Sequence, residues 1–141
     1  MIGIAALALM GLMAGAGAGG KDDCPGPTTL EINNCMAREL DRAQAELHRY
    51  VMAAGKRLRQ EDQAVAVGGF DKAETSWTAY RDTECDAVYA YWSEGTIRNA
   101  MELGCKIKLT REHTHAIWRL WLTYPDSTPA ILPEPRVVPD R

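Results

Sequence analysis

Apolar residues recur at the spacing of one face of an α-helix in three separate stretches of the chain. In the first stretch they are Met36, Leu40, Ala43, Leu47, Tyr50, Ala54 and Leu58. In the second they are Phe70, Ala73, Trp77, Tyr80, Val88 and Tyr91 or Trp92, and in the third Ile97, Met101, Cys105, Leu109, Ile117, Leu120 and Trp121. The pattern predicts three helices, over residues 29–62, 70–93 and 96–122, each antiparallel to its sequence neighbour because the connections are short.

Residues with short polar side chains mark two of the predicted helix starts. Thr28 or Thr29 is suited to cap the first helix, and Glu31 follows in its first turn. Thr96 is suited to cap the third helix in the same way.

Glycines mark the predicted helix ends. The first helix is expected to fade after Leu58 and to end before the Gly68-Gly69 pair, a strong local breaker. The second helix is expected to end at the sequence SEG, where Gly95 is suited to a positive φ that closes the turn.

The two ends of the chain differ in character from its middle. Residues 1–20 hold an apolar run followed by small residues, too short to span a bilayer, and they are predicted to be a signal peptide. The alternative for this segment is a disordered apolar N-terminus. Residues 125–141 hold five of the seven prolines, so this tail is expected to be extended or disordered. One domain is left, over residues 24–122.

Charge excludes one class of partner. The net charge is −3 and charged residues make up 25% of the chain. The composition therefore lacks the excess of lysine and arginine that is typical of nucleic-acid-binding proteins. A mild acidic balance is compatible with a basic protein partner, without requiring one.

The four cysteines, Cys24, Cys35, Cys85 and Cys105, favour a disulfide framework in an exported domain. Cys85 and Cys105 lie ten residues on either side of Gly95, so a helical hairpin that turns there brings them together. Cys24 then pairs with Cys35, although four cysteines allow two other connectivities. No pair has the Cys-x-x-Cys spacing, which argues against a metal site built on cysteine.

One face of the second helix combines unusual residue types. Trp77, Arg81 and Cys85 are spaced by four and share this face, with Tyr80 and Glu84 beside it. On a stripe that faces the core, Arg81 needs an acidic or carbonyl partner. The candidates on the first helix are Glu39, Asp41 and Glu46. The alternative is that Arg81 and Asp82 form an exposed recognition pair.

The chain offers no recognisable catalytic or cofactor-binding motif. His113 and His115 are two residues apart, so a helix points them in different directions, unlike the i, i+4 pair of a zinc site. His48 is expected at the solvated edge of the first helix. No nucleophile elbow, phosphate loop or His-Glu-x-x-His motif is present, and we therefore expect neither an enzyme nor a cofactor, metal or small-molecule substrate.

The layout resembles the LprI-type lysozyme inhibitor family of small exported helical proteins. The most specific match is Trp77-x-x-Tyr80-Arg81-Asp82-x-x-Cys85, followed after nineteen intervening residues by Cys105 and then by Leu109-Thr110. The sequence departs from the family where an arginine is common three residues after the threonine, because His113 stands there. The resemblance implies an all-α domain, stapled here by two disulfides, that is periplasmic or secreted and binds a lysozyme-type hydrolase.

Two functions follow from these observations. The first is inhibition of a peptidoglycan hydrolase by steric occlusion of its cleft, and the alternative is a non-inhibitory cell-envelope module that binds another protein. The expected contact surface is the turn over residues 89–96, where Tyr91, Trp92 and Glu94 meet at a helix end. The simpler interpretation of this turn is that Tyr91 or Trp92 only covers the end of the core.

Overall fold

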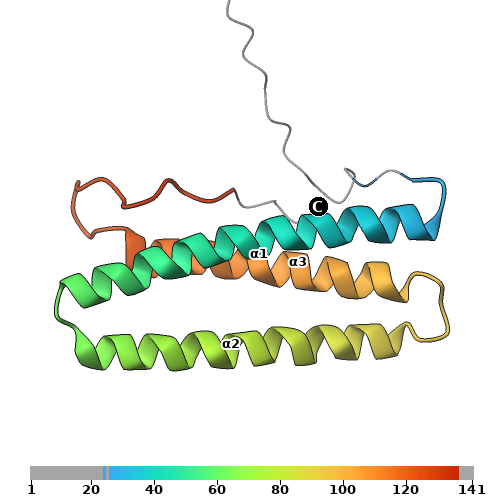
Figure 1. Cartoon of the computed structure of the whole chain (residues 1–141), viewed down its shortest axis with the longest axis horizontal. Coiled ribbons are helices and arrows are strands. Elements are labelled where there is room, and N and C mark those ends of the chain that lie inside the picture. The colour runs from blue at the N-terminus through green and yellow to red at the C-terminus, as the bar shows by residue number, and fades with distance from the viewer. Residues whose placement is uncertain (1–23, 25, 137–141) are drawn as a thin grey trace, which may run out of the picture.

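A computed structural model describes residue 24 and residues 26–136 of the chain. The predicted signal peptide over residues 1–20 and the last five residues of the tail lie outside the described residues. Within them the chain forms three long helices arranged side by side, with α3 in contact with both α1 and α2 (Figure 1). The described part contains no strand, which confirms the predicted all-α fold of three antiparallel helices.

The first helix, α1 (Thr29–Gln60), begins at the residue that the sequence favoured. The Thr28 hydroxyl accepts the backbone N–H of Glu31 at 3.2 Å, and the Glu31 carboxylate accepts the backbone N–H of Thr28 at 3.1 Å. This reciprocal pair satisfies two donors that a helix start leaves free. The buried face contains Ala43, Leu47, Tyr50, Ala54 and Leu58, all from the predicted stripe.

The connection from α1 to α2 (Ala64–Tyr91) lies earlier in the chain than predicted. Asp62 has φ +54°, its N–H donates to the Arg59 carbonyl, and the N–H of Gln63 donates to the Leu58 carbonyl. These are the two hydrogen bonds of a Schellman motif, with aspartate where glycine is usual.

The prediction that Gly68-Gly69 breaks the chain between helices was therefore wrong. Both glycines lie inside α2, which starts six residues before the predicted Phe70. A glycine in a helix costs only about 1 kcal/mol relative to alanine. Phe70 is 4% exposed, and Ala66 and Val67 pack against the same core, so tertiary packing offsets that cost.

The turn from α2 to α3 (Arg98–Ile117) also differs from the prediction in detail. Among the described residues no glycine has a positive φ, so Gly95 does not close the turn in that way. Thr96 does not cap α3, because Ile97 precedes its first residue and makes no side-chain capping bond. A π-helical turn, η2 (Trp118–Leu122), continues α3 to the predicted end at Leu122.

Both predicted disulfides are present. Cys24 pairs with Cys35 at a Cα–Cα distance of 5.4 Å, and Cys85 pairs with Cys105 at 5.6 Å. The first bridge ties the segment before α1 to that helix, and the second joins α2 to α3. The symmetry of the second helical hairpin was therefore a sound guide to cysteine pairing.

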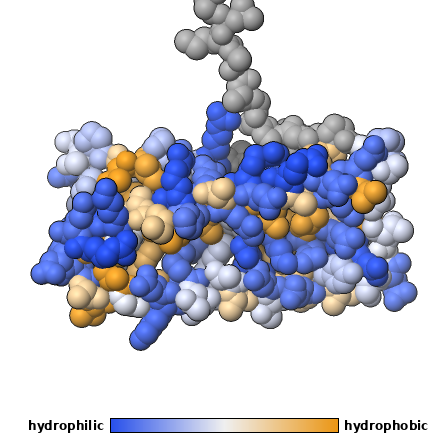
Figure 2. Space-filling view, viewed as in Figure 1, coloured by the Kyte–Doolittle hydropathy of each residue, from blue (hydrophilic) through white to orange (hydrophobic). Residues whose placement is uncertain are grey.

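The apolar core lies toward one end of the bundle, while hydrophilic residues predominate on the molecular face that Figure 2 shows. Its buried members are Leu47, Tyr50, Ala54, Leu58, Phe70, Ile117 and Leu122. They come from the second half of α1, the start of α2 and the end of α3, which meet where α1 connects to α2 (Figure 1). The Cys85–Cys105 bridge lies toward the opposite end, so the disulfide and the core stabilise different parts of the bundle.

The proline-rich tail is docked on the bundle as far as Arg136, the last residue that the structure describes. From Thr123 to Arg136 it forms no helix or strand and turns back along the bundle (Figure 1). Leu132 packs against the core, and Pro135 is buried. Within the described residues, no helix has the length and apolar character needed to cross a membrane.

Candidate functional site

The turn between α2 and α3 closes the end of the bundle opposite the core. The N–H of Trp92 donates to the Val88 carbonyl at 3.2 Å, and the N–H of Gly95 donates to the Trp92 carbonyl at 2.9 Å. Below the turn, the disulfide joins the flanking helices, and its Cys85 is fully buried. These constraints fix much of the backbone in advance, which lowers the ordering entropy that binding a partner would cost.

The aromatic side chains of this turn point outward. Tyr91 is 83% exposed and Trp92 is 36% exposed, and their rings contact each other edge to face at 5.5 Å. The simpler interpretation, in which one of them covers the core, is therefore wrong for Tyr91. Exposed rings of this size, held against each other, are suitable anchors for a protein interface.

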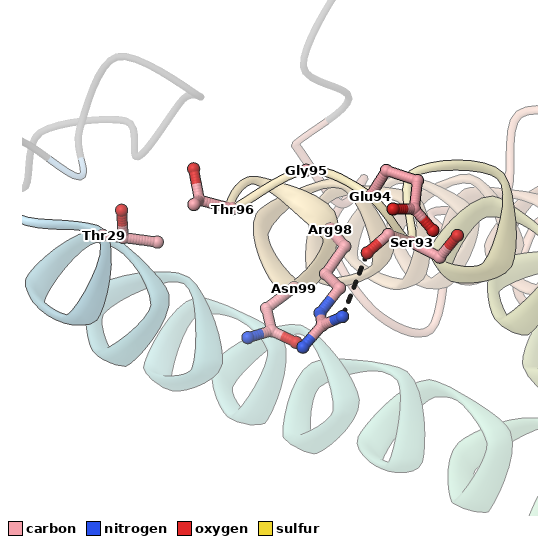
Figure 3. A pocket seen from close by; sticks show the side chains of 7 residues that line it. All are labelled: Thr29, Ser93, Glu94, Gly95, Thr96, Arg98 and Asn99. Atoms are coloured by element: carbon pink, nitrogen blue, oxygen red, sulfur yellow. Dashed lines mark hydrogen bonds between the residues drawn. The ribbon is translucent and has the colours of Figure 1, made fainter.

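An open depression lies between the turn and the start of α1. Its lining consists of Thr29, Ser93, Glu94, Gly95, Thr96, Arg98 and Asn99, and Figure 3 shows Thr29 across from the turn residues. The Arg98 guanidinium donates to the Ser93 carbonyl at 3.0 Å and lies 5.4 Å from the centre of the Tyr89 ring. Arg98 is thus turned onto its own helical hairpin, and Glu94 is the acidic group that lines the depression.

The second half of α2 carries an acidic surface toward this turn. From Asp82 to Ile97, both included, the chain has four acidic residues and no lysine or arginine. Glu84, Asp86 and Glu94 are all exposed. This end of the bundle therefore has a local negative charge that the overall net charge of −3 does not reveal.

One cation of α3 partly neutralises the acidic surface. The Lys106 ammonium lies 2.5 Å from a Glu102 carboxylate oxygen and 3.8 Å from Asp86. The hydrogen bond to Glu102 raises the pKa of Lys106 above its ordinary value, with a smaller contribution from Asp86. Lys106 therefore stays charged, and Glu84 and Glu94 are left to face solvent.

Arg81 is buried and its partner is not the predicted one. Its guanidinium donates twice to the adjacent Asp82 carboxylate, at 2.9 and 2.7 Å, and lies 5.3 Å from the centre of the Trp77 ring. Of the three candidates on α1, Glu39 instead pairs with Arg111 at 2.9 Å. Because the Arg81 side chain is only 11% exposed, the alternative of an exposed recognition pair is wrong for Arg81. Tyr80, by contrast, is 53% exposed.

A histidine stacked on a tryptophan at the interface of α2 and α3 was not predicted from the sequence. The His113 ring lies parallel to the Trp77 ring, with the centroids 4.0 Å apart. Its Nε2 atom is 3.0 Å from both carboxylate oxygens of Glu74. Glu74 and Trp77 are three residues apart on one helical face, and this spacing is the signal that would have suggested a shared partner.

The other two histidines lie as their positions predicted. His115 points away from His113 and contacts Glu134 of the tail at 2.9 Å, while His48 is exposed. Within residues 24 and 26–136, no group of three His, Cys, Asp or Glu side chains is arranged to hold a metal ion.

Comparison with known proteins gives two matches. The family model described as lysozyme inhibitor LprI matches residues 22–117. An uncharacterized protein of Rhizobium meliloti (strain 1021), designated R02472, is 31% identical over 94 residues, which cover 60% of this chain and 68% of the relative. No solved structure matches the chain.

Proposed function

Because the chain belongs to the LprI lysozyme inhibitor family, we propose that it is an exported inhibitor of lysozyme-type peptidoglycan hydrolases that acts by occluding the cleft. The two disulfides are consistent with export, since such bridges persist in oxidising compartments. The family is one of inhibitors, and inhibition by occlusion needs no catalytic group.

The observation that carries the proposal is the exposed aromatic pair on an acidic, disulfide-braced turn. Tyr91 and Trp92 supply the apolar contact area, and Glu94 supplies a carboxylate for the cationic rim of a basic hydrolase. Such a pairing of charges speeds association and orients the partners more than it adds affinity. We expect the two aromatic rings to provide most of the binding affinity.

The test is a lysozyme turbidity assay with the oxidised mature protein, against hydrolases of more than one lysozyme type. We expect Trp92→Ala to weaken inhibition about tenfold or more, as truncation of an interface anchor does. We expect Glu94→Lys to weaken it about fivefold, with a larger effect at low ionic strength because the interaction is electrostatic.

Matched controls are available at the other end of α2. Val65 is 93% exposed and Asp71 is exposed, so Val65→Ala and Asp71→Lys change apolar area and charge away from the turn. Circular dichroism and thermal unfolding of all four variants separate loss of contact from loss of fold. If Glu94→Lys leaves both stability and inhibition unchanged, the turn is not the contact surface, and the exposed faces around Tyr80 and Asp82 become the next candidates.

The alternative function is a non-inhibitory cell-envelope module that binds another protein through the same exposed aromatic end. The exposure of Tyr91 supports protein binding of either kind. A wild-type protein that is folded and oxidised, yet leaves every lysozyme tested fully active, would favour this alternative.

A further inference from the structure

The solvent face of α1 carries a row of exposed side chains that is rich in cations. The residues of this row recur at steps of three and four, so they lie on one side of the helix, opposite its buried stripe. At the rise of an α-helix the row is about 31 Å long. Its members are Arg38, Arg42, Ala45, Arg49, Met52, Lys56 and Arg59, all of them exposed.

The charge of this row is opposite in sign to that of the whole chain. Five of its side chains are cationic and none is acidic, and Asp41 is the one exposed acidic residue between Arg38 and Arg59. The chain as a whole has a net charge of −3. Positive charge is therefore concentrated on the solvent face of α1, whereas the second half of α2 is acidic.

Ion pairs within α1 neutralise this row only in part. Arg42 pairs with Glu39, but that carboxylate also binds Arg111 at 2.9 Å, and Arg49 lies 3.8 Å from Glu46. Arg42 and Arg49 both remain exposed. Arg38 and Lys56 are exposed as well and make no ion pair or hydrogen bond within the part of the chain that the structure describes. The row thus presents its charge to solvent.

The uncharged members of the row indicate what kind of anionic partner fits it. Met52 is 53% exposed and lies between Arg49 and Lys56. The row has no aromatic side chain, so it lacks the stacking surfaces that single-stranded nucleic acids use. A straight row of cations around an exposed, flexible apolar side chain suits a bilayer surface, where the cations meet phosphate groups and the methionine reaches the acyl boundary.

We propose that the solvent face of α1 binds reversibly to the surface of bilayers that contain anionic phospholipids. Each cation held near such a surface strengthens binding by roughly fivefold, so five of them suffice for association without insertion. α1 and α2 form opposite sides of the bundle (Figure 1), so a bound molecule directs its acidic α2 away from the bilayer. The inference goes beyond lysozyme inhibition and does not depend on it.

The test is co-sedimentation of the oxidised mature protein with phospholipid vesicles. We expect binding to phosphatidylcholine vesicles that contain about 30% phosphatidylglycerol, and none to pure phosphatidylcholine. Binding at about 0.1 M salt is expected to be lost at about 0.5 M, because salt screens exposed charges. The double variant Arg38→Gln/Lys56→Gln removes two unpaired cations from the row and is expected to bind about 25-fold more weakly.

The matched control is Lys72→Gln/Lys108→Gln, which removes the same charge at exposed positions of α2 and α3. It is expected to bind within about twofold of wild type, since these positions lie outside the row. Equal losses in the two double variants would mean that binding follows net charge alone, and the proposal would be wrong. It would be wrong as well if wild type did not bind the anionic vesicles at low salt.

A duplex DNA of about 20 base pairs serves as the competing polyanion at equal phosphate concentration. We expect the vesicles to bind more tightly, and tighter binding to the duplex would overturn the proposal in favour of nucleic acid. Circular dichroism checks that the variants fold. Should the α1 double variant not fold, Arg38→Gln alone is expected to weaken vesicle binding about fivefold, and an unchanged affinity would overturn the proposal.

Discussion

Asp62 ends α1 in a conformation that usually requires glycine. Its φ of +54° lies in the left-handed region, which glycine adopts most easily, but the residue at this position is aspartate. Aspartate tolerates this region better than most residues, because its short polar side chain bonds locally, but it still carries a steric cost. Because glycine was taken as the signal for a helix end, the tight connection from α1 to α2 at Asp62 was not predicted.

We expect Asp62→Gly to raise the free energy of unfolding by about 0.5–1 kcal/mol, because relief of the strain exceeds the added entropy of the unfolded chain. Urea denaturation measures the change. Asp62→Asn is the matched control, since it removes the charge but keeps a residue that tolerates positive φ, and its stability is expected to stay within about 0.5 kcal/mol of wild type. A lower stability for Asp62→Gly would show that the aspartate side chain itself stabilises the turn.

At the scale of an element, α2 is the least buried of the three long helices. Its buried residues are only Phe70, Arg81 and Cys85. Gly68 and Gly69 are exposed in its interior, and a Cβ built on either meets nothing within 4 Å. The structure gives no reason for glycine at these two positions, so the first turns of α2 are less stable than they could be.

Gly68→Ala and Gly69→Ala are each expected to increase stability by about 0.5–1 kcal/mol, because alanine loses less backbone entropy in a helix. Gly26→Ala is a contrasting variant, since its Cβ would lie 2.9 Å from the Glu31 Cβ and 3.3 Å from the Ile32 nitrogen. We expect that variant to destabilise the start of α1. Thermal unfolding of the three variants decides between these outcomes.

The Cys85–Cys105 bridge stabilises the end of the bundle that lies away from the core. It closes a loop with a sequence separation of 20 residues, so its removal is expected to cost about 3 kcal/mol. The double variant Cys85→Ala/Cys105→Ala, compared with Cys24→Ala/Cys35→Ala, measures the two bridges separately. If inhibition depends on the turn, the first variant also loses inhibition beyond its loss of folded protein, whereas an effect on stability alone would argue against the braced turn as the contact.

At the scale of the whole molecule, two groups link stability to alkaline pH. Burial raises the pKa of the Tyr50 phenol above its ordinary value of 10.0, and the Glu102 hydrogen bond raises the pKa of Lys106 above 10.5. Both groups hold their protons more tightly in the folded state. Their contribution to stability is therefore complete below about pH 10 and is lost as the pH rises through the folded-state pKa values.

We expect the free energy of unfolding to fall above about pH 10, by up to about 1.4 kcal/mol per pH unit for each group. Tyr50→Phe is expected to be less stable at pH 7, because it loses the hydrogen bond to the Pro133 carbonyl, but to show a shallower decline at high pH. Tyr91→Phe, at an exposed ring, is expected to follow wild type. Equal alkaline slopes for all three proteins would exclude Tyr50 as a source of the pH dependence.

The sequence by itself determined the features that depend on near neighbours in the chain. The three helices, the cap at Thr28 and the buried stripe of α1 follow from contacts over three or four residues, which periodicity and residue type reveal. Both disulfides were predicted as well, one from the symmetry of a short hairpin and the other because it used the remaining cysteines.

Only the tertiary structure decided which of several possible partners a side chain contacts. Arg81 pairs with the adjacent Asp82 and not with an acidic residue of α1. His113 stacks on Trp77, and Leu132 of the tail packs against the core. Composition offers several partners of similar chemistry for each of these groups, and the choice among them depends on how the helices are placed. The outward direction of Tyr91 was decided in the same way, because helical spacing alone does not say whether the end of a stripe reaches beyond the core.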